Sequence, residues 1–568
     1  MGSQLFRKKS IDQIKKDYDA THGGSVGNLK KVLGVWDLTF LGIAAVIGAG
    51  IFSTIGNAAF NGGPGVSILF IITAVACGFS ALCYAEFASR VPVSGSAYTY
   101  SYVTFGELIA WIIGWALILE YAIGNIVVAI SWSGYFNNLL VNLFHINLPS
   151  WMLVDPMTAK HAFTEASSAL AGGSVTDPQQ LKNYQFALNA WNEAPTIGGQ
   201  KVFFNLPACI IVILITWLAY TGIRESKQTA NYMVLFKVAV ILFVIVAGAF
   251  YVDTNNWTPF MPNRFEGVLK GVSAVFYAYI GFDAISTTAE EAKNPQKDMP
   301  KAMIYSLLIC TVLYILIALV LTGIENYSNF KDVNDPLAFV FEGRAPWIEN
   351  IVSISAVVAT TSVLLVFQLG QPRIWMSMSR DGLLPKKFQK IHPKYQTPSF
   401  ATIVTGVLVA VPALFLEDAL VTDLTSIGTL FAFALVAGGV LFLPRIPKEP
   451  GRFSLPYING KYLIPLIMAI FMYAFNGRIG EAVRNFGNTD SQEMLFLIFI
   501  VLAIILSVLT FIRNYSFIPI MGVLFCLYLM VEIPSNSWLV FFGWMVLGLL
   551  IYFLYGYRYS KLADKVNA

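Results

Sequence analysis

The sequence predicts an all-α membrane protein, because its composition, its long apolar segments and its loop charges all indicate that fold class. Of the 568 residues, 56% are hydrophobic and only 12% are charged. Soluble globular proteins carry about 25% charged residues. The mean hydropathy is +0.65. A chain this poor in charge lacks the surface of a water-soluble protein.

The apolar segments are the spanning elements that we expect. A membrane-spanning helix needs about 20 mostly apolar residues. The chain contains fourteen such segments, near 35–60, 65–89, 107–140, 203–221, 229–252, 265–289, 301–324, 346–370, 399–416, 424–444, 462–478, 493–512, 516–532 and 536–556. The third is long enough to tilt or to extend beyond the bilayer.

The charges of the tails and loops predict the orientation. Residues 1–31 carry seven Lys and Arg before any apolar segment, which is typical of a cytoplasmic tail and not of a cleavable signal peptide. With this tail inside, the inner loops are basic, as cytoplasmic loops usually are: Arg224, Lys227, Lys293, Lys297, Lys301, Arg380, Lys386, Lys387, Lys390, Lys394, Arg445, Lys448 and Arg452. Fourteen spans then put the 559–568 tail inside as well, in a multi-pass protein of the cell membrane.

One loop is long for a connection. Residues 141–202 form a polar insert with Asp155, Glu165, Asp177 and Glu193, on the outside in this orientation. The insert is either a lid or partner surface, or a solvated excursion with no special role.

Several function classes lack support. The net charge is only +4, with no nucleic-acid motif. The five cysteines lie in apolar segments without metal-ligand spacing, and the four histidines lie in the tail, loops or segment ends. The apolar segments contain no Gly-x-Ser-x-Gly elbow for an enzyme and no repeated filter loop for a channel. We therefore expect neither an enzyme nor a bound cofactor or metal.

The first span contains a candidate helix break. Gly42, Gly48 and Gly50 fall within nine residues, and glycine weakens a helix. Small residues also let helices pack closely. On this segment alone, packing and binding are equally good interpretations.

The sixth span contains a second candidate break, at Gly281 beside Asp283. A carboxyl group inside the membrane costs at least about 2.5 kcal/mol unless it is paired or lines a wet cavity. Breaks at matching places five helices apart are typical of an inverted-repeat transporter. The sequence therefore predicts one repeat over 32–252, a second over 253–446 and accessory helices over 447–558.

The two breaks together suit an α-amino acid. The half-helix N-terminus at Gly48, Ala49 and Gly50 offers N–H groups to a carboxylate. The unwound carbonyls of Tyr277, Ala278 and Ile280 offer acceptors to an ammonium group.

Two more charges lie in apolar spans, Lys237 in the fifth and Glu120 in the third. They form either a buried pair that fixes packing or a proton relay, because burial disfavours the charged form of lysine. Arg373 and Arg380 follow the eighth span, where they snorkel or act as gate residues.

These motifs resemble the cationic amino acid transporter branch of the amino acid–polyamine–organocation superfamily, and its bacterial members in particular. The resemblance covers about 31–562 and rests on these segments: Ile47–Phe52, Tyr84–Phe87, Pro92–Tyr98, Gly114–Trp115, Leu117–Tyr121, Tyr279–Asp283, Glu290–Glu291, Asn294–Pro295 and Ser379–Pro385.

The resemblance implies a five-plus-five inverted-repeat (LeuT-like) fold with accessory C-terminal helices, in the bacterial inner membrane. It implies that Lys237 is the fifth-helix lysine of proton-coupled relatives, whose ammonium stands where sodium-coupled relatives bind a sodium ion. Glu120 matches a third-helix glutamate near that lysine, and Asp283 matches a sixth-helix acid near the substrate side chain.

One position departs from the family pattern. Cationic carriers tend to have a small residue about six positions before the Pro-Arg pair of the eighth helix, where this chain has Phe367. A phenyl ring there shortens the pocket, which favours neutral over cationic L-amino acids. We therefore expect proton-coupled symport of L-amino acids. We also expect Ala45 to be one of the substrate-binding residues. Sodium-independent exchange of amino acids or polyamines, cationic amino acid transport and amino-acid sensing without transport stay as alternatives.

Overall fold

The computed structural model describes residues 5–9, 33–91, 96–171, 178–221, 226–331, 333, 335–395, 397–443, 452–484 and 491–564. Most of the predicted basic tail, the start of the Pro92–Tyr98 motif and three basic loop residues (Arg224, Arg445 and Lys448) lie outside the described residues. The described chain is almost entirely helical. Its only sheet pairs two short strands, β1 (Thr196–Ile197) and β2 (Gln200–Lys201).

Each of the fourteen predicted spans coincides with helix. The first ten correspond to α3 (Val35–Val46) with η1 (Gly50–Thr54) and α4 (Ile55–Gly62); α5 (Val66–Arg90); α7 (Glu107–Phe144); α10 (Leu206–Thr221); α11 (Ser226–Ala249); α12 (Arg264–Leu269) with α13 (Val272–Tyr277) and η5 (Phe282–Glu291); α14 (Pro295–Ile324); α16 (Pro346–Arg380); α17 (Ser399–Ala413) and α18 (Asp418–Val440). The last four are α19 (Leu463–Ala474) with α20 (Asn476–Arg484), α21 (Ser491–Arg513), α22 (Phe517–Val531), and α23 (Ser535–Ile551) with η8 (Tyr552–Gly556).

By length and apolarity, eight helical segments of the described chain can each cross a membrane, or nine if the pair α19 and α20, bent by 68°, counts as one span. Four further apolar helices are shorter: α3, α10, α17 and α22. The α3 helix is short because the chain breaks directly after it. Two predicted ends fall early, since α7 continues to Phe144 and α16 to Arg380.

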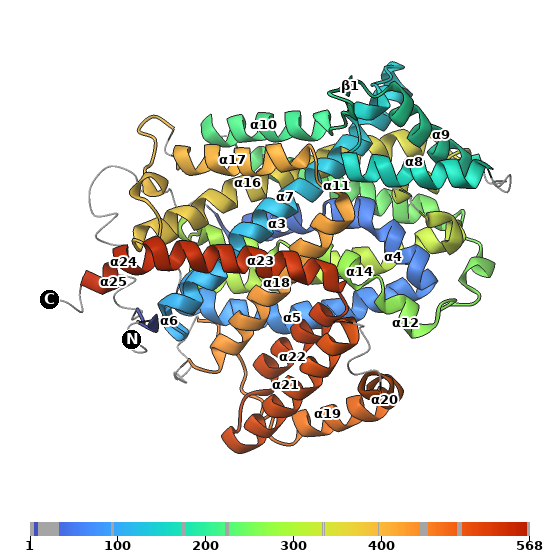
Figure 1. Cartoon of the computed structure of the whole chain (residues 1–568). Helices are drawn as coiled ribbons and strands as arrows, with labels where there is room; N and C mark the ends of the chain where they lie inside the picture. The colour runs from blue at the N-terminus through green and yellow to red at the C-terminus, as the bar shows by residue number, and fades with distance from the viewer. Residues whose placement is uncertain are drawn as a thin grey trace.

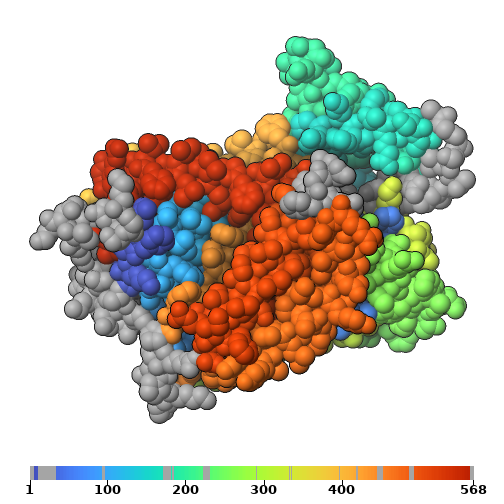
Figure 2. Space-filling model, turned by 60° about the horizontal axis from the view of Figure 1, so that its bottom comes forward, coloured from blue at the N-terminus to red at the C-terminus, as the bar shows by residue number. Residues whose placement is uncertain are grey.

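The long helices α5, α7, α14 and α16 run side by side, and both chain ends lie at the same end of this bundle (Figure 1). We call that end the terminal face; it carries residues 5–9, α6 (Ser96–Thr104), α24 (Tyr557–Tyr559) and α25 (Lys561–Asp564). The opposite face carries α4, α12 and the 141–202 insert. The accessory helices α19–α22 form a block on one flank, in front in Figure 2.

Large apolar side chains cover the outer surfaces of several helices. Examples are Trp217 on α10 at 64% exposed, Val246 on α11 at 61% and Leu539 on α23 at 73%. Isolated exposed apolar residues are ordinary, but continuous apolar faces on parallel membrane-length helices indicate contact with lipid.

The described part of the 141–202 insert is a small folded unit. It contains α8 (Pro156–Ala171), α9 (Pro178–Glu193) and the two strands, and it projects from the body in Figure 2. Ala159, Ala194 and Phe203 form its own apolar core. Its backbone is tied to the bundle where Asn205 donates to the carbonyl of Leu414 at 3.0 Å.

Both predicted breaks are present, and they cross each other. The first lies between α3 and η1, and the second lies between α13 and η5. A side chain at Gly50 would place its Cβ 2.3 Å from the Cα of Ala278, so only glycine permits this crossing. Gly281 has φ +117°, a conformation that L side chains rarely adopt, and packs on Ala45.

Candidate functional site

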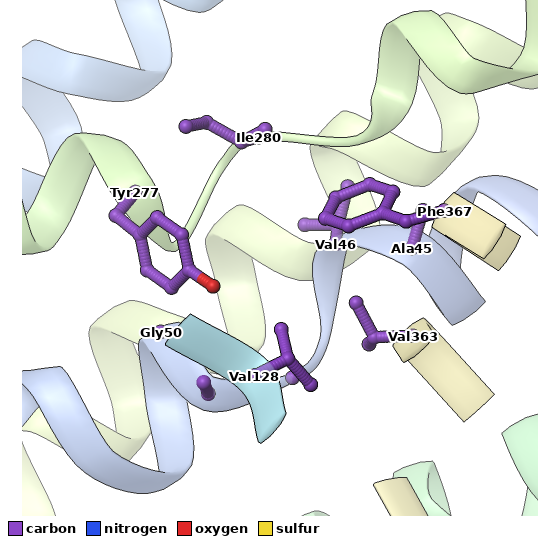
Figure 3. A pocket seen from close by; sticks show the side chains of 10 residues that line it. Ala45, Val46, Gly50, Val128, Tyr277, Ile280, Val363 and Phe367 are labelled. Atoms are coloured by element: carbon purple, nitrogen blue, oxygen red, sulfur yellow. The ribbon is translucent and has the colours of Figure 1, made fainter. Parts of the chain in front are cut away.

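The two breaks enclose a small cavity at the centre of the bundle. Figure 3 shows Tyr277 and Phe367 on opposite sides of it, with the first break between them. The lining residues are Ala45, Val46, Gly48, Ala49, Gly50, Val128, Tyr277, Ile280, Val363 and Phe367. The cavity volume is about 10 Å³, roughly the space of one water molecule. A larger molecule therefore requires the apolar lining to move.

The first break supplies hydrogen-bond donors to this cavity. The first N–H groups of a helix have no partner inside that helix. Ile51 and Phe52 both donate to the carbonyl of Gly48 at 3.2 Å, and the residues before them, Gly48, Ala49 and Gly50, line the cavity. Three adjacent N–H groups at a half-helix N-terminus favour an anion such as a carboxylate.

The second break supplies acceptors. Tyr277 and Ile280 line the cavity, and the turn between them is held by Ile280 N–H donating to the Tyr277 carbonyl at 3.2 Å. Ala278 is not a lining residue, because it packs under Gly50 at the crossing. The carbonyls of this unwound turn can accept hydrogen bonds from an ammonium group.

Lys237 closes the end of the first half-helix. Its Nζ donates to the carbonyls of Ala44 at 2.9 Å and Ile47 at 2.7 Å, and to Ser362 Oγ at 3.0 Å. An α-helix leaves its last carbonyls without partners, and these two belong to the end of α3. Three acceptors match the three hydrogens of an ammonium group. The lysine is fully buried, so α11 joins α3 to α16 at this point.

Glu120 does not pair with Lys237. All three Lys237 donors are used by α3 and α16, and Glu120 instead lies against α18, with its Cβ near Gly428. Its charge interacts with that of Asp283, which is not a lining residue of the cavity. The predicted Lys–Glu pair is therefore wrong as a contact: the third-helix and fifth-helix charges belong to two separate centres.

The second centre is a buried carboxyl pair. Glu120 is 2% exposed and Asp283 is 1% exposed. Within the described part of the chain, Glu120 Oε2, Asp283 Oδ2 and the hydroxyls of Tyr84 and Tyr121 have no hydrogen-bond partner. Two buried carboxylates whose charges interact repel each other when both are ionised, which favours a state in which one of them is protonated.

Phe367 forms the apolar end of the cavity together with residues that the sequence analysis did not select. Its ring packs on Tyr121 with 5.4 Å between ring centroids and lies against Gly124. Val128 and Val363 complete the wall. Gly124 and Val128 follow Glu120 at helical spacing, and Val363 precedes Phe367 by four, so the i, i+4 pattern could have identified them.

One of the two arginines after the eighth span, Arg373, bridges to a broken helix. Arg373 Nη2 forms an ion pair with Glu291 Oε1 at 2.5 Å, which joins α16 to the end of η5. Arg380 is the last residue of α16, on the terminal face. The described residues contain no group of His, Cys, Asp and Glu side chains that could hold a metal ion.

Membrane-length helices with two crossing breaks and a cavity between them define a membrane carrier for a small molecule. The chain belongs to the amino acid permease family: residues 33–481 match the profile described as "Amino acid permease" and residues 514–560 match "C-terminus of AA_permease". The fold is accordingly the five-plus-five inverted-repeat class with additional C-terminal helices.

Relatives that the chain matches over most of its length are named as transporters. The chain is 38% identical to "Branched-chain amino acid permease BcaP" of Bacillus subtilis (strain 168), covering 99% of this chain and 100% of that protein. It is 36% identical to "Methylthioribose transporter" of the same organism, covering 99% of each. It is also 36% identical to "Cationic amino acid transporter 2, vacuolar" of Arabidopsis thaliana, covering 77% of this chain and 63% of that protein. The protein is therefore a membrane transporter of the amino acid permease family and not an enzyme.

Proposed function

We propose that this permease takes up neutral L-amino acids together with protons by alternating access. The observation that carries the proposal is the pair of crossing breaks, with N–H donors on one and carbonyl acceptors on the other, beside an apolar end. These three features match the carboxylate, the ammonium group and the side chain of a neutral amino acid. Gly48 and Gly50 bind the substrate carboxylate. Tyr277 and Ile280 bind its ammonium group, and Phe367 contacts its side chain.

The names of the relatives leave the substrate open, since similar identities accompany a branched-chain permease, a methylthioribose transporter and a cationic carrier. Of these substrates, the cavity favours a branched-chain amino acid. Its side-chain end consists of Val128, Val363 and Phe367, with no charged residue in the lining. A buried guanidinium or ammonium group without a partner is costly, whereas an aliphatic side chain gains about 25 cal/mol for each Å² that it buries.

Lys237 supports proton coupling. The ammonium form fills all three acceptors between α3 and α16, but a neutral amine has only two hydrogens to donate. Loss of the proton therefore leaves one of these three acceptors on α3 and α16 without its hydrogen bond from Lys237. A proton on Lys237 stabilises the arrangement in which α3 and α16 are held together around the closed cavity. Release of this proton favours opening of the cavity.

The Glu120–Asp283 pair is a second candidate proton carrier. It lies at the base of η5, so its charge bears on the same broken helix that holds the ammonium group of the substrate. We propose that the pair takes up a proton when the cavity opens to the outside. The protonation of Lys237, in contrast, depends on the position of α3.

The orientation that we propose places the terminal face in the cytoplasm and the 141–202 insert outside the cell membrane. The loops of the terminal face are basic, as the positive-inside rule requires of short cytoplasmic loops. Their described basic residues include Lys293, Lys386, Lys387, Lys390, Arg558 and Lys561.

Thermal unfolding and uptake together test this function. The purified protein is screened against all twenty L-amino acids, common polyamines and methylthioribose, and the stabilising compounds are then assayed for uptake into proteoliposomes. We expect branched-chain and other neutral amino acids to stabilise the protein, and an inwardly directed proton gradient to drive their accumulation. Stabilisation without flux indicates a sensor, and flux that needs internal substrate but ignores the gradient indicates an exchanger. Stabilisation by methylthioribose alone would overturn the amino acid assignment.

A further inference from the structure

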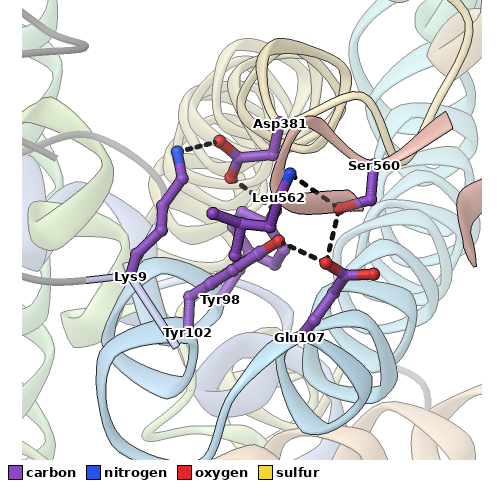
Figure 4. A network of polar contacts seen from close by, with 7 residues as sticks. All are labelled: Lys9, Tyr98, Tyr102, Glu107, Asp381, Ser560 and Leu562. Carbon is purple, nitrogen blue, oxygen red and sulfur yellow. Dashed lines mark hydrogen bonds and ion pairs between the residues drawn. The ribbon is translucent and has the colours of Figure 1, made fainter. Parts of the chain in front are cut away.

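Both ends of the chain bind the same corner of the bundle on the terminal face (Figure 4). From the N-terminal segment Leu5–Lys9, the Lys9 Nζ forms an ion pair with Asp381 Oδ1 at 2.5 Å. The backbone of the segment is also fixed, because Lys9 N–H donates to the Tyr102 carbonyl at 3.4 Å and Glu107 N–H donates to the Arg7 carbonyl at 2.9 Å.

The C-terminal end reaches Glu107 and Asp381 from the other side. Ser560 Oγ donates to Glu107 Oε2 at 2.5 Å, and the hydroxyl of Tyr552 donates to Glu107 Oε1 at 3.0 Å. The N–H of Lys561 donates to the backbone carbonyl of Asp381 at 3.1 Å. The two termini therefore meet around Asp381, at the end of α16, and Glu107, at the start of α7.

Both carboxylates are held in a buried site. Glu107 is fully buried and also accepts from the hydroxyl of Tyr102 at 3.0 Å. The Asp381 side chain is 14% exposed and accepts from the hydroxyl of Tyr98 at 2.6 Å. Because a buried carboxylate is costly without donors or a cation, Lys9 is the group that balances the charge of Asp381 here.

Two glycines make room for the chain ends. Gly106 has φ +98°, and a Cβ there would lie 2.7 Å from the backbone of Phe6. Gly382 has φ +84°, and a Cβ there would lie 2.3 Å from the carbonyl oxygen of Tyr559. The sequence thus accommodates close backbone contact on both sides, which distinguishes this arrangement from a chance surface contact.

The corner is connected to the cavity through α16. This helix carries Val363 and Phe367 at the cavity, then Arg373 in its ion pair with Glu291, and it ends one residue before Asp381. Leu33, which precedes α3, forms a parallel bridge with Ala292, which follows η5. The two broken helices are therefore fastened to each other and to α16 on the terminal face, and α16 is fastened in turn to α6, α7 and the N-terminal segment.

We propose that the segment Leu5–Lys9 is a latch of the transport cycle, in which Lys9 holds α16 against α6 and α7 while the terminal face is closed. Movement of α16 relative to α6 and α7 must break the Lys9–Asp381 ion pair, because the segment is anchored through its backbone to Tyr102 on α6 and to Glu107 on α7. Lys9 is a positioning residue: it contacts neither the cavity nor Lys237. The latch acts in the same way for any substrate and any coupling ion.

Hydrogen exchange of the full-length protein tests the latch without a gradient. We expect Lys9→Ala to speed amide exchange at the end of α16 and around the Leu33–Ala292 bridge by about fivefold or more, the size of a typical coupling between sites. Lys8→Ala is the matched control, because it removes the same charge from an exposed neighbour. Lys9→Arg keeps the ion pair and should keep slow exchange.

Transport kinetics and a charge swap separate a latch from a merely structural contact. We expect Lys9→Ala to raise the maximal rate of counterflow while the KM stays within twofold, and the double variant Lys9→Asp/Asp381→Lys to restore slow exchange. Exchange in Lys9→Ala that equals that of Lys8→Ala would overturn the proposal, as would a double variant that exchanges faster than either single one. If the unaltered protein shows no counterflow at all, the proposed function fails, but the exchange result still decides the latch.

Discussion

Lys237 donates a hydrogen bond to the carbonyl of Ile47, 2.7 Å away, at the point where the first transmembrane helix breaks. The neighbouring carbonyl of Val46 accepts from the hydroxyl of Tyr314 on α14 at 2.9 Å. The end of α3 is therefore completed by side chains from two other helices, although the half-helix itself lacks partners for these carbonyls. This dependence makes Lys237 the first residue to test.

Replacing Lys237 with alanine should abolish proton-driven accumulation. The variant leaves the carbonyls of Ala44 and Ile47 buried without a donor, at about 1–3 kcal/mol each, and removes the proton-dependent link between α3 and α16. Uptake of a neutral amino acid into proteoliposomes with an imposed pH gradient measures the effect. Lys270→Ala, an exposed lysine on the opposite face, is the control. Undiminished gradient-driven accumulation in Lys237→Ala would rule out this lysine as the coupling residue.

The apolar end of the cavity predicts a change of substrate. Phe367→Ser removes the ring that separates the cavity from Tyr121, and it opens a route toward the carboxyl pair Glu120 and Asp283. We expect the variant to gain arginine binding and uptake, since the guanidinium group then finds an anionic partner. Thermal stabilisation by arginine, compared with the unaltered protein, is the measurement. If arginine fails to stabilise a Phe367→Ser variant that still binds neutral amino acids, Phe367 is not the residue that limits the side-chain end of the cavity.

The sequence predicted more of the backbone than of the side-chain contacts, for a physical reason. Helix position follows from apolar length, and the breaks follow from Gly48, Gly50 and Gly281, all of which are local signals. The partners of Lys237 depend on how helices far apart in sequence are rotated against each other, which a single apolar segment does not encode. Glu120 was therefore expected beside Lys237, whereas the structure places it beside Asp283.

The contacts around Asp381 and Glu107 on the terminal face were not predicted from the sequence, for the same reason. Lys9 and Asp381 are 372 positions apart, and each belongs to a basic or polar segment that reads as solvent-exposed. Gly106 and Gly382 were the available signals, because isolated glycines at helix ends often mark a close backbone approach. The roles of the site residues stay predictions, since geometry places them without measuring transport.

The crossing of the two breaks predicts a strict requirement for glycine at position 50. A methyl group there would meet the backbone of Ala278 at 2.3 Å, and overpacking of this kind costs about 1–3 kcal/mol. We expect Gly50→Ala to lower the melting temperature and to abolish substrate binding. Gly78→Ala on α5 is the matched control, because a Cβ at that position has no neighbour within 4 Å, and alanine favours helix there. Equal binding by the two variants would contradict the crossing geometry.

The carboxyl pair predicts non-additive effects on coupling. Glu120→Gln and Asp283→Asn each remove one of the two carboxyl groups that interact in a buried site, so each should change the dependence of uptake on external pH. The proton of such a pair belongs to both groups, and the second substitution should then add little to the first.

Proton-driven accumulation and counterflow are measured for both single variants and the double variant. We expect counterflow to persist while accumulation falls about tenfold, and the combined loss to be smaller than the product of the single losses. Fully multiplicative losses would mean that the two carboxyl groups titrate independently, and the shared-proton account of this centre would then be abandoned.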